Sequence, residues 1–273
     1  MKDNLLIHSM SEFASVTIAV LEAINAKSVC EIGAEHGGNS KLLHSWATYQ
    51  KGKFISIDPA PGAEFLAWVK ETNDIVSHLS KISLEAISEV GPVDVWFVNG
   101  DHNWYTVYHE LAAIYASSRK NQCPFMVFLH DVDWPCSRRD AYCAPKRIPS
   151  EFVHPHSWEL GVTLDKKELI DGGIRGNGEF AWALHEGGTR NGVLTAVEDF
   201  VEQHPQEFYW SFIPAIFGLG VLFDRNHPAV NKIVQTLAPF NESPLLAKLE
   251  KNRLKNYLKV MEWEDKNRLN AAV

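Results

Sequence analysis

The sequence predicts an α/β protein with a doubly wound, mostly parallel sheet of seven strands. A C-terminal antiparallel hairpin would close the sheet, and a long insertion would follow the fifth strand. Three observations carry this prediction. Between residues 28 and 131, apolar β-branched segments alternate five times with amphipathic helical segments, which is typical of a parallel sheet. The alternation then stops until about residue 192. Finally, two strand-like segments meet tightly around Pro214.

The elements of the first half follow from hydrophobic spacing. Residues 11–25 carry apolar side chains at helical intervals behind a serine. Short apolar runs that end in Gly, Asp, Asn or His are typical of buried strands. We therefore expect strands at 28–33, 53–57, 74–78, 93–98 and 124–129. The intervening helices are expected from about 39, and at 62–71, 84–89 and 105–118.

The second half completes the sheet. A helix is expected at 194–203, strands at 208–213 and 216–223, and a charged helical tail after residue 228. We interpret the 273 residues as a single domain. Its parts are an N-terminal helical segment (1–27), a binding core (28–131), an insertion (132–192), a closing helix and hairpin (193–227) and a helical tail (228–273).

Composition narrows the class of protein. Hydrophobic residues make up 45% and charged residues 22% of the chain, as in ordinary soluble globular proteins. The net charge of −8 provides no electrostatic footprint for a nucleic acid. The longest apolar run, 212–223, is interrupted by proline and glycine and is too short to span a bilayer. The four cysteines form no Cys-x-x-Cys pair, so we expect reduced thiols in a cytoplasmic protein.

A glycine-rich loop joins the first strand to its helix. Residues 31–40 read Glu-Ile-Gly-Ala-Glu-His-Gly-Gly-Asn-Ser, with a Gly33-x-x-x-Gly37 spacing that differs from the dinucleotide fingerprint. Such glycines permit close approach of a ligand beside a helix N-terminus, although a purely structural turn would also use them. Asp58 ends the next strand, where a carboxylate can accept ribose hydroxyls. A helix-capping Asp58 is the alternative.

A second cluster follows the fourth and fifth strands. Asp101-His102 and His130-Asp131 come directly after these strands, which should be neighbours about 4.8 Å apart in a sheet ordered 3-2-1-4-5. Asp101, His130 and Asp131 could then hold a divalent cation. The oxygen-rich set favours magnesium or manganese, while histidine ligands would also suit iron or zinc. The alternative is a capped strand end with an Asp–His hydrogen bond and no metal.

These motifs resemble a known family. The loop, preceded by Glu31, resembles motif I of class I S-adenosylmethionine-dependent methyltransferases. Residues 97–105, Phe-Val-Asn-Gly-Asp-His-x-x-Tyr, resemble the strand-four signature of metal-dependent small-molecule O-methyltransferases, particularly the macrocin O-methyltransferase-like group. The resemblance covers roughly residues 28–131 and the closing hairpin. It departs after the fifth strand, where His130-Asp131 stands in place of an acidic pair.

The resemblance implies a Rossmann-like fold and S-adenosylmethionine as cofactor. The implied reaction is O-methylation of a small molecule in natural product biosynthesis, assisted by a divalent metal. Catalysis would fall to Asp101, His102 and His130, with His102 as the base. The residues expected to bind the cofactor are Glu31, Gly33, Glu35, Gly37, Ser40, Asp58, Ser83 and Asn99.

Two other functions remain open at this point. The cofactor could serve N- or C-methylation or an internal displacement on its aminobutyrate chain, or the chain could be a non-catalytic binding module. The expected partner is a small-molecule acceptor, without nucleic acid or membrane, and a homo-oligomer is open. Residues 132–192 are expected to fold over the acceptor as a lid. Arg138 and Arg139 could pair with an acidic acceptor, or could lock the insertion to the domain together with Asp140.

Overall fold

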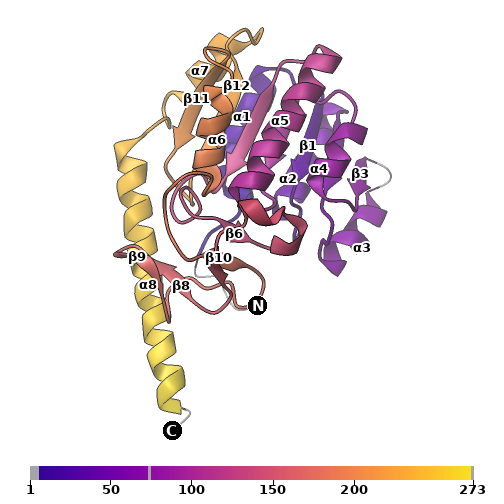
Figure 1. Cartoon of the computed structure of the whole chain (residues 1–273). Helices are drawn as coiled ribbons and strands as arrows, with labels where there is room; N and C mark the ends of the chain where they lie inside the picture. The colour runs from indigo at the N-terminus through magenta and orange to yellow at the C-terminus, as the bar shows by residue number, and fades with distance from the viewer. Residues whose placement is uncertain (1–5, 73–74, 272–273) are drawn as a thin grey trace.

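A seven-stranded sheet forms the centre of the computed structural model, which describes residues 6–72 and 75–271 (Figure 1). The strand order is β11-β12-β5-β4-β1-β2-β3. Only β12 runs antiparallel to both of its neighbours, β5 and β11. The strands are β1 (Ser28–Ile32), β2 (Lys53–Ile57), β3 (Val76–Leu79), β4 (Val95–Val98), β5 (Met126–His130), β11 (Phe208–Ile213) and β12 (Leu219–Asp224). The doubly wound sheet and its closing hairpin are therefore confirmed.

The parallel strands end in register at one edge of the sheet. Ile32 at the end of β1 lies opposite Ile57 and Val98, and Val98 lies opposite Leu129. The predicted adjacency of the fourth and fifth strands is confirmed by the β4–β5 pairing. The residues that follow β1, β2, β4 and β5 consequently meet at this edge, as expected at a topological switch point.

Helices cover both faces of the sheet, so its central strands are buried on both sides and almost wholly apolar. One apolar core lies under α4 (Ser83–Ala86), α5 (Trp104–Asn121) and α6 (Val193–Glu202). The other lies under α1 (Ala14–Ala23), α2 (Gly38–Gln50), α3 (Ala63–Glu71) and α7 (Val230–Leu237). Several elements differ by one to three residues from their predicted bounds. Asp74, at the start of the third predicted strand, lies outside the described residues.

The C-terminal tail forms two helices rather than one continuous stretch. After α7, the 28-residue helix α8 (Pro244–Ala271) runs along the side of the molecule, and its far half extends past the sheet (Figure 1). There it lies beside a hairpin of strands β8 (Gly161–Thr163) and β9 (Lys166–Ile170), and Arg175, which follows this hairpin, donates to Asp265 at 2.6 Å. Within the described part of the chain, no helix is long and apolar enough to cross a membrane.

The insertion contains regular structure that its sequence did not predict. Strands of two to five residues are too short to show a hydrophobic period, so the sequence of this region shows no regular spacing of apolar residues. The strands build a three-stranded sheet in the order β6-β10-β7 and a separate β8–β9 hairpin. Their bounds are β6 (Ala141–Tyr142), β7 (His156–Ser157), β8 (Gly161–Thr163), β9 (Lys166–Ile170) and β10 (Ala181–Ala183).

Charged side chains at the start of the insertion hold it to the domain. Arg139 is 2% exposed and ties the insertion together internally, because it donates to the carbonyls of Ala183 and Lys167. Asp140 accepts the backbone N–H groups of Trp104 and Gly192, each at 2.7 Å. Arg138 pairs with Glu198 of α6 at 2.7 Å. Of the two interpretations of this cluster, the structure supports the one in which it locks the insertion in place.

Candidate active site

The β1–α2 loop passes close to the end of β4, and this explains its glycines. Gly33 has φ +89°, and a Cβ atom there would lie 2.0 Å from the carbonyl oxygen of Asn99. Gly37 has φ +80°, and a Cβ atom there would lie 2.9 Å from the ring of Phe65. At both positions any other residue would be strained by the positive φ, and its Cβ atom would clash with the neighbouring group. Gly33 thus lets the loop lie against Asn99, and Gly37 lets it pack against Phe65, whichever ligand the loop serves.

Asp58 holds the same loop. Its Oδ2 accepts the N–H groups of Ala34 at 2.9 Å and Glu35 at 3.0 Å, and its Oδ1 accepts that of Ala60 at 2.8 Å. Asp58 thus clamps the loop but caps neither neighbouring helix, since the N-caps of α2 and α3 are Gly37 and Gly62. Each carboxylate oxygen can accept two hydrogen bonds, so Oδ1 keeps capacity for one more. Binding of a ribose by Asp58 stays a prediction.

Glu31 and Ser40 face each other beneath the start of α2. Glu31 is 1% exposed, and it accepts hydrogen bonds from the Asn39 amide at 2.8 Å and from the Ser40 hydroxyl. Burial raises the pKa of Glu31 to about 7, although both hydrogen bonds favour its charged form. These two residues shape the loop from within, whereas Glu35 points to solvent with 75% of its side chain exposed.

The first turn of α2 offers polar groups to a ligand. Its N-cap, Gly37, supplies no side-chain hydrogen bond, so the first amides can receive an anionic group. The buried Oδ1 of Asn39 also has no hydrogen-bond partner among the described residues. A buried polar atom without a partner is uncommon in proteins and needs an explanation. The first amides of α2 can therefore receive an acidic group of a ligand, whereas the Asn39 Oδ1 is enclosed by the protein.

Ser83 begins α4 beside a buried carboxyl group that the sequence analysis missed. Glu110 of α5 is fully buried, and neither of its oxygens has a hydrogen-bond partner in the described part of the molecule. Burial raises the pKa of Glu110 to about 8, and the negative charge of nearby Asp101 contributes to this rise. Ser83 and His102 act in the opposite direction and lower this pKa. Glu110 interrupts the apolar stripe of Val107, Leu111 and Ile114. That interruption is the sequence signal that could have revealed it.

Two histidines flank Asp131 just beyond β4 and β5. Oδ2 of Asp131 lies 3.0 Å from Nε2 of His102 and 3.0 Å from Nδ1 of His130. The same two nitrogens lie 3.2 Å from Oδ1 of Asn99. The structure thus brings together four of the residues that the sequence placed at this edge. Their roles remain predictions.

Hydrogen-bond geometry assigns the proton on the His102 ring. A carboxylate only accepts, so Nε2 of His102 carries the hydrogen toward Asp131, and a neutral His102 ring has its lone pair on Nδ1. Burial disfavours a charged His102, but Asp131 outweighs this and raises the pKa of His102 above 6.5. Asp131 is also buried, yet the neighbouring His130 and His102 hold its pKa below the usual range.

The predicted metal ligands are not arranged as a metal site. Asp101 accepts the N–H of Cys143, in the insertion, at 3.2 Å and the hydroxyl of Thr106, on α5, at 3.4 Å. Both ring nitrogens of His130 are occupied, Nδ1 by Asp131 and Nε2 by the carbonyl of Ile216 at 2.8 Å. Over residues 6–72 and 75–271, no group of three or more His, Cys, Asp or Glu side chains could hold a metal ion. The Asp–His hydrogen bond of the alternative interpretation is present between Asp131 and His102.

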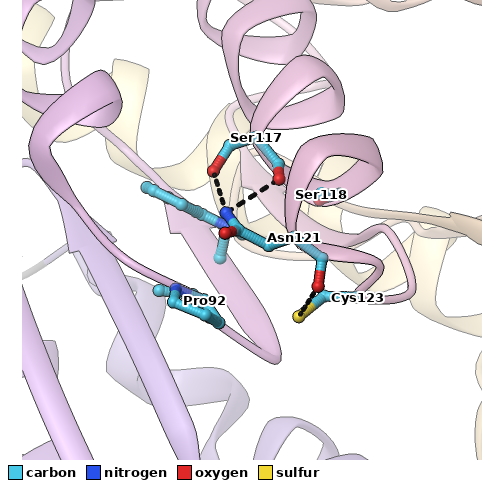
Figure 2. Close-up of a pocket in the computed structure, with 7 residues that line it drawn as sticks. Pro92, Ser117, Ser118, Asn121 and Cys123 are labelled. Carbon is cyan, nitrogen blue, oxygen red and sulfur yellow. Dashed lines mark hydrogen bonds between the residues drawn. The ribbon is translucent and has the colours of Figure 1, made fainter.

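Surface hollows occur elsewhere on the molecule. Figure 2 shows a recess between the start of β4 and the end of α5, where Asn121 donates to the carbonyl of Ser117 at 2.9 Å. Pro92 and Cys123 also line it. The recess lies at the edge of the sheet where the parallel strands begin, opposite the edge that carries His102 and Asp131. We assign it no part in the site.

No protein-family model and no curated protein matches the sequence. The fold is similar to that of solved methyltransferases. One is a putative caffeoyl-CoA O-methyltransferase from Staphylococcus aureus (12% identity, 81% of this chain and 87% of that chain covered, TM-score 0.47). Another is a Podospora anserina methyltransferase with bound S-adenosylhomocysteine (12% identity, 77% of each chain, TM-score 0.45). A third is a Burkholderia thailandensis 1,6-didemethyltoxoflavin N1-methyltransferase (11% identity, 78% and 80% covered, TM-score 0.40). At these identities and TM-scores the likeness concerns the fold alone, and the doubly wound α/β architecture rests on the strand order described above.

Proposed function

We propose that this protein transfers a methyl group from S-adenosylmethionine to an oxygen atom of a small molecule, with His102 as the general base. One observation carries the proposal. The Asp131–His102 pair lies at the same sheet edge as the β1–α2 loop and Asp58. A base oriented by a carboxylate beside a nucleotide-type loop suits proton removal from a hydroxyl group during transfer.

Several residues of this chain fit the cofactor. The free capacity of Asp58 Oδ1 suits a ribose hydroxyl, and the uncapped amides of α2 suit the carboxylate of the methionine moiety. The bound cofactor would supply an electrophilic methyl group. The protein must then chiefly orient and deprotonate the acceptor.

His102 would take the proton on Nδ1, the nitrogen opposite its contact with Asp131. Asp131 fixes the ring and stabilises the imidazolium that forms, as a carboxylate does in other carboxylate–histidine pairs. The acidity of an ordinary hydroxyl is too low for spontaneous ionisation near neutral pH. Base assistance of this kind therefore distinguishes a transferase from a binding module.

The proposal is tested by incubating the protein with S-adenosylmethionine and candidate hydroxylated acceptors, and by mass spectrometry of the products. We expect S-adenosylhomocysteine and a product methylated on oxygen. Methylation on nitrogen or carbon, or a cyclised fragment of the cofactor, would replace O-methylation by the corresponding alternative. Saturable cofactor binding without turnover of any acceptor would favour a binding module.

Asp58 gives a prediction on cofactor affinity. Asp58→Asn keeps an oxygen acceptor for the loop amides but removes the charge, so S-adenosylmethionine should bind about 1–3 kcal/mol more weakly. Titration calorimetry measures this. Asp165→Asn, in the exposed turn between β8 and β9, is the control and should bind like wild type. Unchanged affinity in Asp58→Asn would leave Asp58 as a loop clamp only.

A second prediction concerns metal dependence. The polar atoms of Asp101 and His130 are engaged within the protein, by Cys143 and Thr106 and by Asp131 and Ile216, and do not fit a cation site. Activity should therefore survive dialysis against a chelator, with metal content checked by elemental analysis. If the chelator abolishes activity and one divalent ion restores it, Asp101, His130 and Asp131 are metal ligands, as the sequence predicted.

A further inference from the structure

The turn between β11 and β12 has an unusual backbone. Ile216, Phe217 and Gly218 have φ values of 49°, 64° and 85°. Left-handed backbone is common for glycine, but for a β-branched residue such as Ile216 it is a genuine outlier. Outliers of this kind persist only where the surroundings determine them, and they gather at functional sites. The groups that hold this turn are therefore informative.

One peptide group of the turn joins the site to helix α8. Its carbonyl oxygen, on Ile216, accepts the Nε2–H of His130 at 2.8 Å. Its N–H, on Phe217, donates to Oε1 of Glu250 at 3.0 Å. The peptide thus forms a continuous chain from a carboxylate to an imidazole. At the far side of the ring, Nδ1 of His130 lies 3.0 Å from Asp131.

The Glu250 end of this chain is firmly held. Glu250 is 6% exposed, and Arg253 donates to both of its oxygens, at 2.6 and 2.7 Å. The guanidinium of Arg253 also lies 4.8 Å from the centre of the Phe217 ring. Burial opposes a charge on Glu250, but Arg253 and the Phe217 N–H outweigh it and lower the pKa of Glu250. Glu250 is therefore an anion at neutral pH.

We propose that Glu250 is a positioning residue that fixes the orientation of the His130 ring, and the hydrogen bond donated by its Nε2–H, through the Ile216–Phe217 peptide. An anion that accepts from a peptide N–H polarises the group and strengthens its carbonyl as an acceptor. The same contact keeps the peptide from rotating and releasing the left-handed Ile216. Orientation of His130 in turn sets Asp131, which orients His102. Only this last, catalytic consequence rests on the proposed function.

The test reads the histidine ring directly. Uniformly ¹⁵N-labelled protein, which reports both histidine rings and backbone amides, is compared by NMR at one fixed pH as wild type, Glu250→Ala and Glu250→Gln. The His130 signals are assigned by their loss in His130→Gln. Glu250→Ala should abolish the slowly exchanging Nε2–H signal of His130. Glu250→Gln, which retains a carbonyl acceptor, should keep that signal and shift it together with the Phe217 amide. Glu264→Ala, on the exposed side of α8, is the control.

Unchanged His130 signals in folded Glu250→Ala would overturn the proposal. If Glu250→Ala fails to fold, Glu250→Gln decides: a shifted Phe217 amide with an unmoved His130 signal would also overturn it. In activity assays, Glu250→Ala should lower kcat about fivefold, the effect of one ordinary hydrogen bond, with cofactor affinity unchanged and recovery in Glu250→Gln. The NMR result stands even if the protein proves to have no transferase activity, so the two failures are distinguishable.

Discussion

Replacing His102 with alanine should lower kcat by about 10²–10⁴-fold, the usual contribution of a general base. Affinity for S-adenosylmethionine should change little, because His102 contacts Asp131 and Asn99 rather than the β1–α2 loop. Steady-state kinetics with calorimetry separates the two effects. His185→Ala, in an exposed part of the insertion, should retain full activity. A His102→Ala protein with near wild-type kcat would remove His102 from the mechanism.

The pH profile gives an independent check on this assignment. A base acts in its neutral form, and Asp131 raises the pKa of His102. The acidic limb of kcat should therefore fall at a pH above the 6.5 of an ordinary imidazole. Asp131→Asn removes this influence while keeping a hydrogen-bond acceptor, so the limb should move to lower pH. A limb that stays in place in Asp131→Asn would assign it to another group.

Replacing Glu110 with glutamine should raise the free energy of unfolding at pH 8 and above by about 1–3 kcal/mol, because a buried carboxylate without hydrogen bonds is costly. The pKa of Glu110 is about 8 in the folded protein against 4.5 for an ordinary glutamate. Between these values the folded state holds a proton that the unfolded state has lost. Wild-type stability should therefore fall as pH rises through this window.

Urea unfolding at several pH values measures the slope. Glu110→Gln should flatten it, while Glu85→Gln, exposed on α4, should leave it unchanged. Some slope should remain, because burial also raises the pKa of Glu31 to about 7. Equal slopes in wild type and Glu110→Gln would show that Glu110 has found a partner, such as a bound water.

Much of the fold could be predicted from local pattern. The bounds of β2 and β11 were predicted to the residue, because their apolar runs stop at Asp58 and Pro214. The meeting of Asn99, His102, His130 and Asp131 followed from one premise, that β4 and β5 are neighbours. Positions at a sheet edge are dictated by strand order, and strand order follows from alternating strands and helices.

Side-chain directions could not be predicted in the same way. Asp101 contacts the insertion because Ala141 pairs with His102 and brings the Cys143 N–H within reach. His130 is held by Ile216, which lies 86 residues further along the chain. No sequence pattern around Cys143 or Ile216 predicts these contacts. The predicted metal site required particular orientations of the Asp101 and His130 side chains. The pairing of Asp131 with His102 required neither of these two orientations.

The place of β12 in the sheet has a consequence for synthesis. This strand fills the gap between β5 and β11, but it follows β5 by about ninety residues in the chain. At 5–20 residues per second, translation leaves the edge of β5 without its neighbour for roughly 5–20 s. During that interval the apolar strand Met126–His130 is an open edge on the nascent chain, and open apolar edges recruit foreign strands. Slower elongation through the insertion should therefore increase aggregation of the newborn protein, even though its finished sheet has β5 enclosed on both sides.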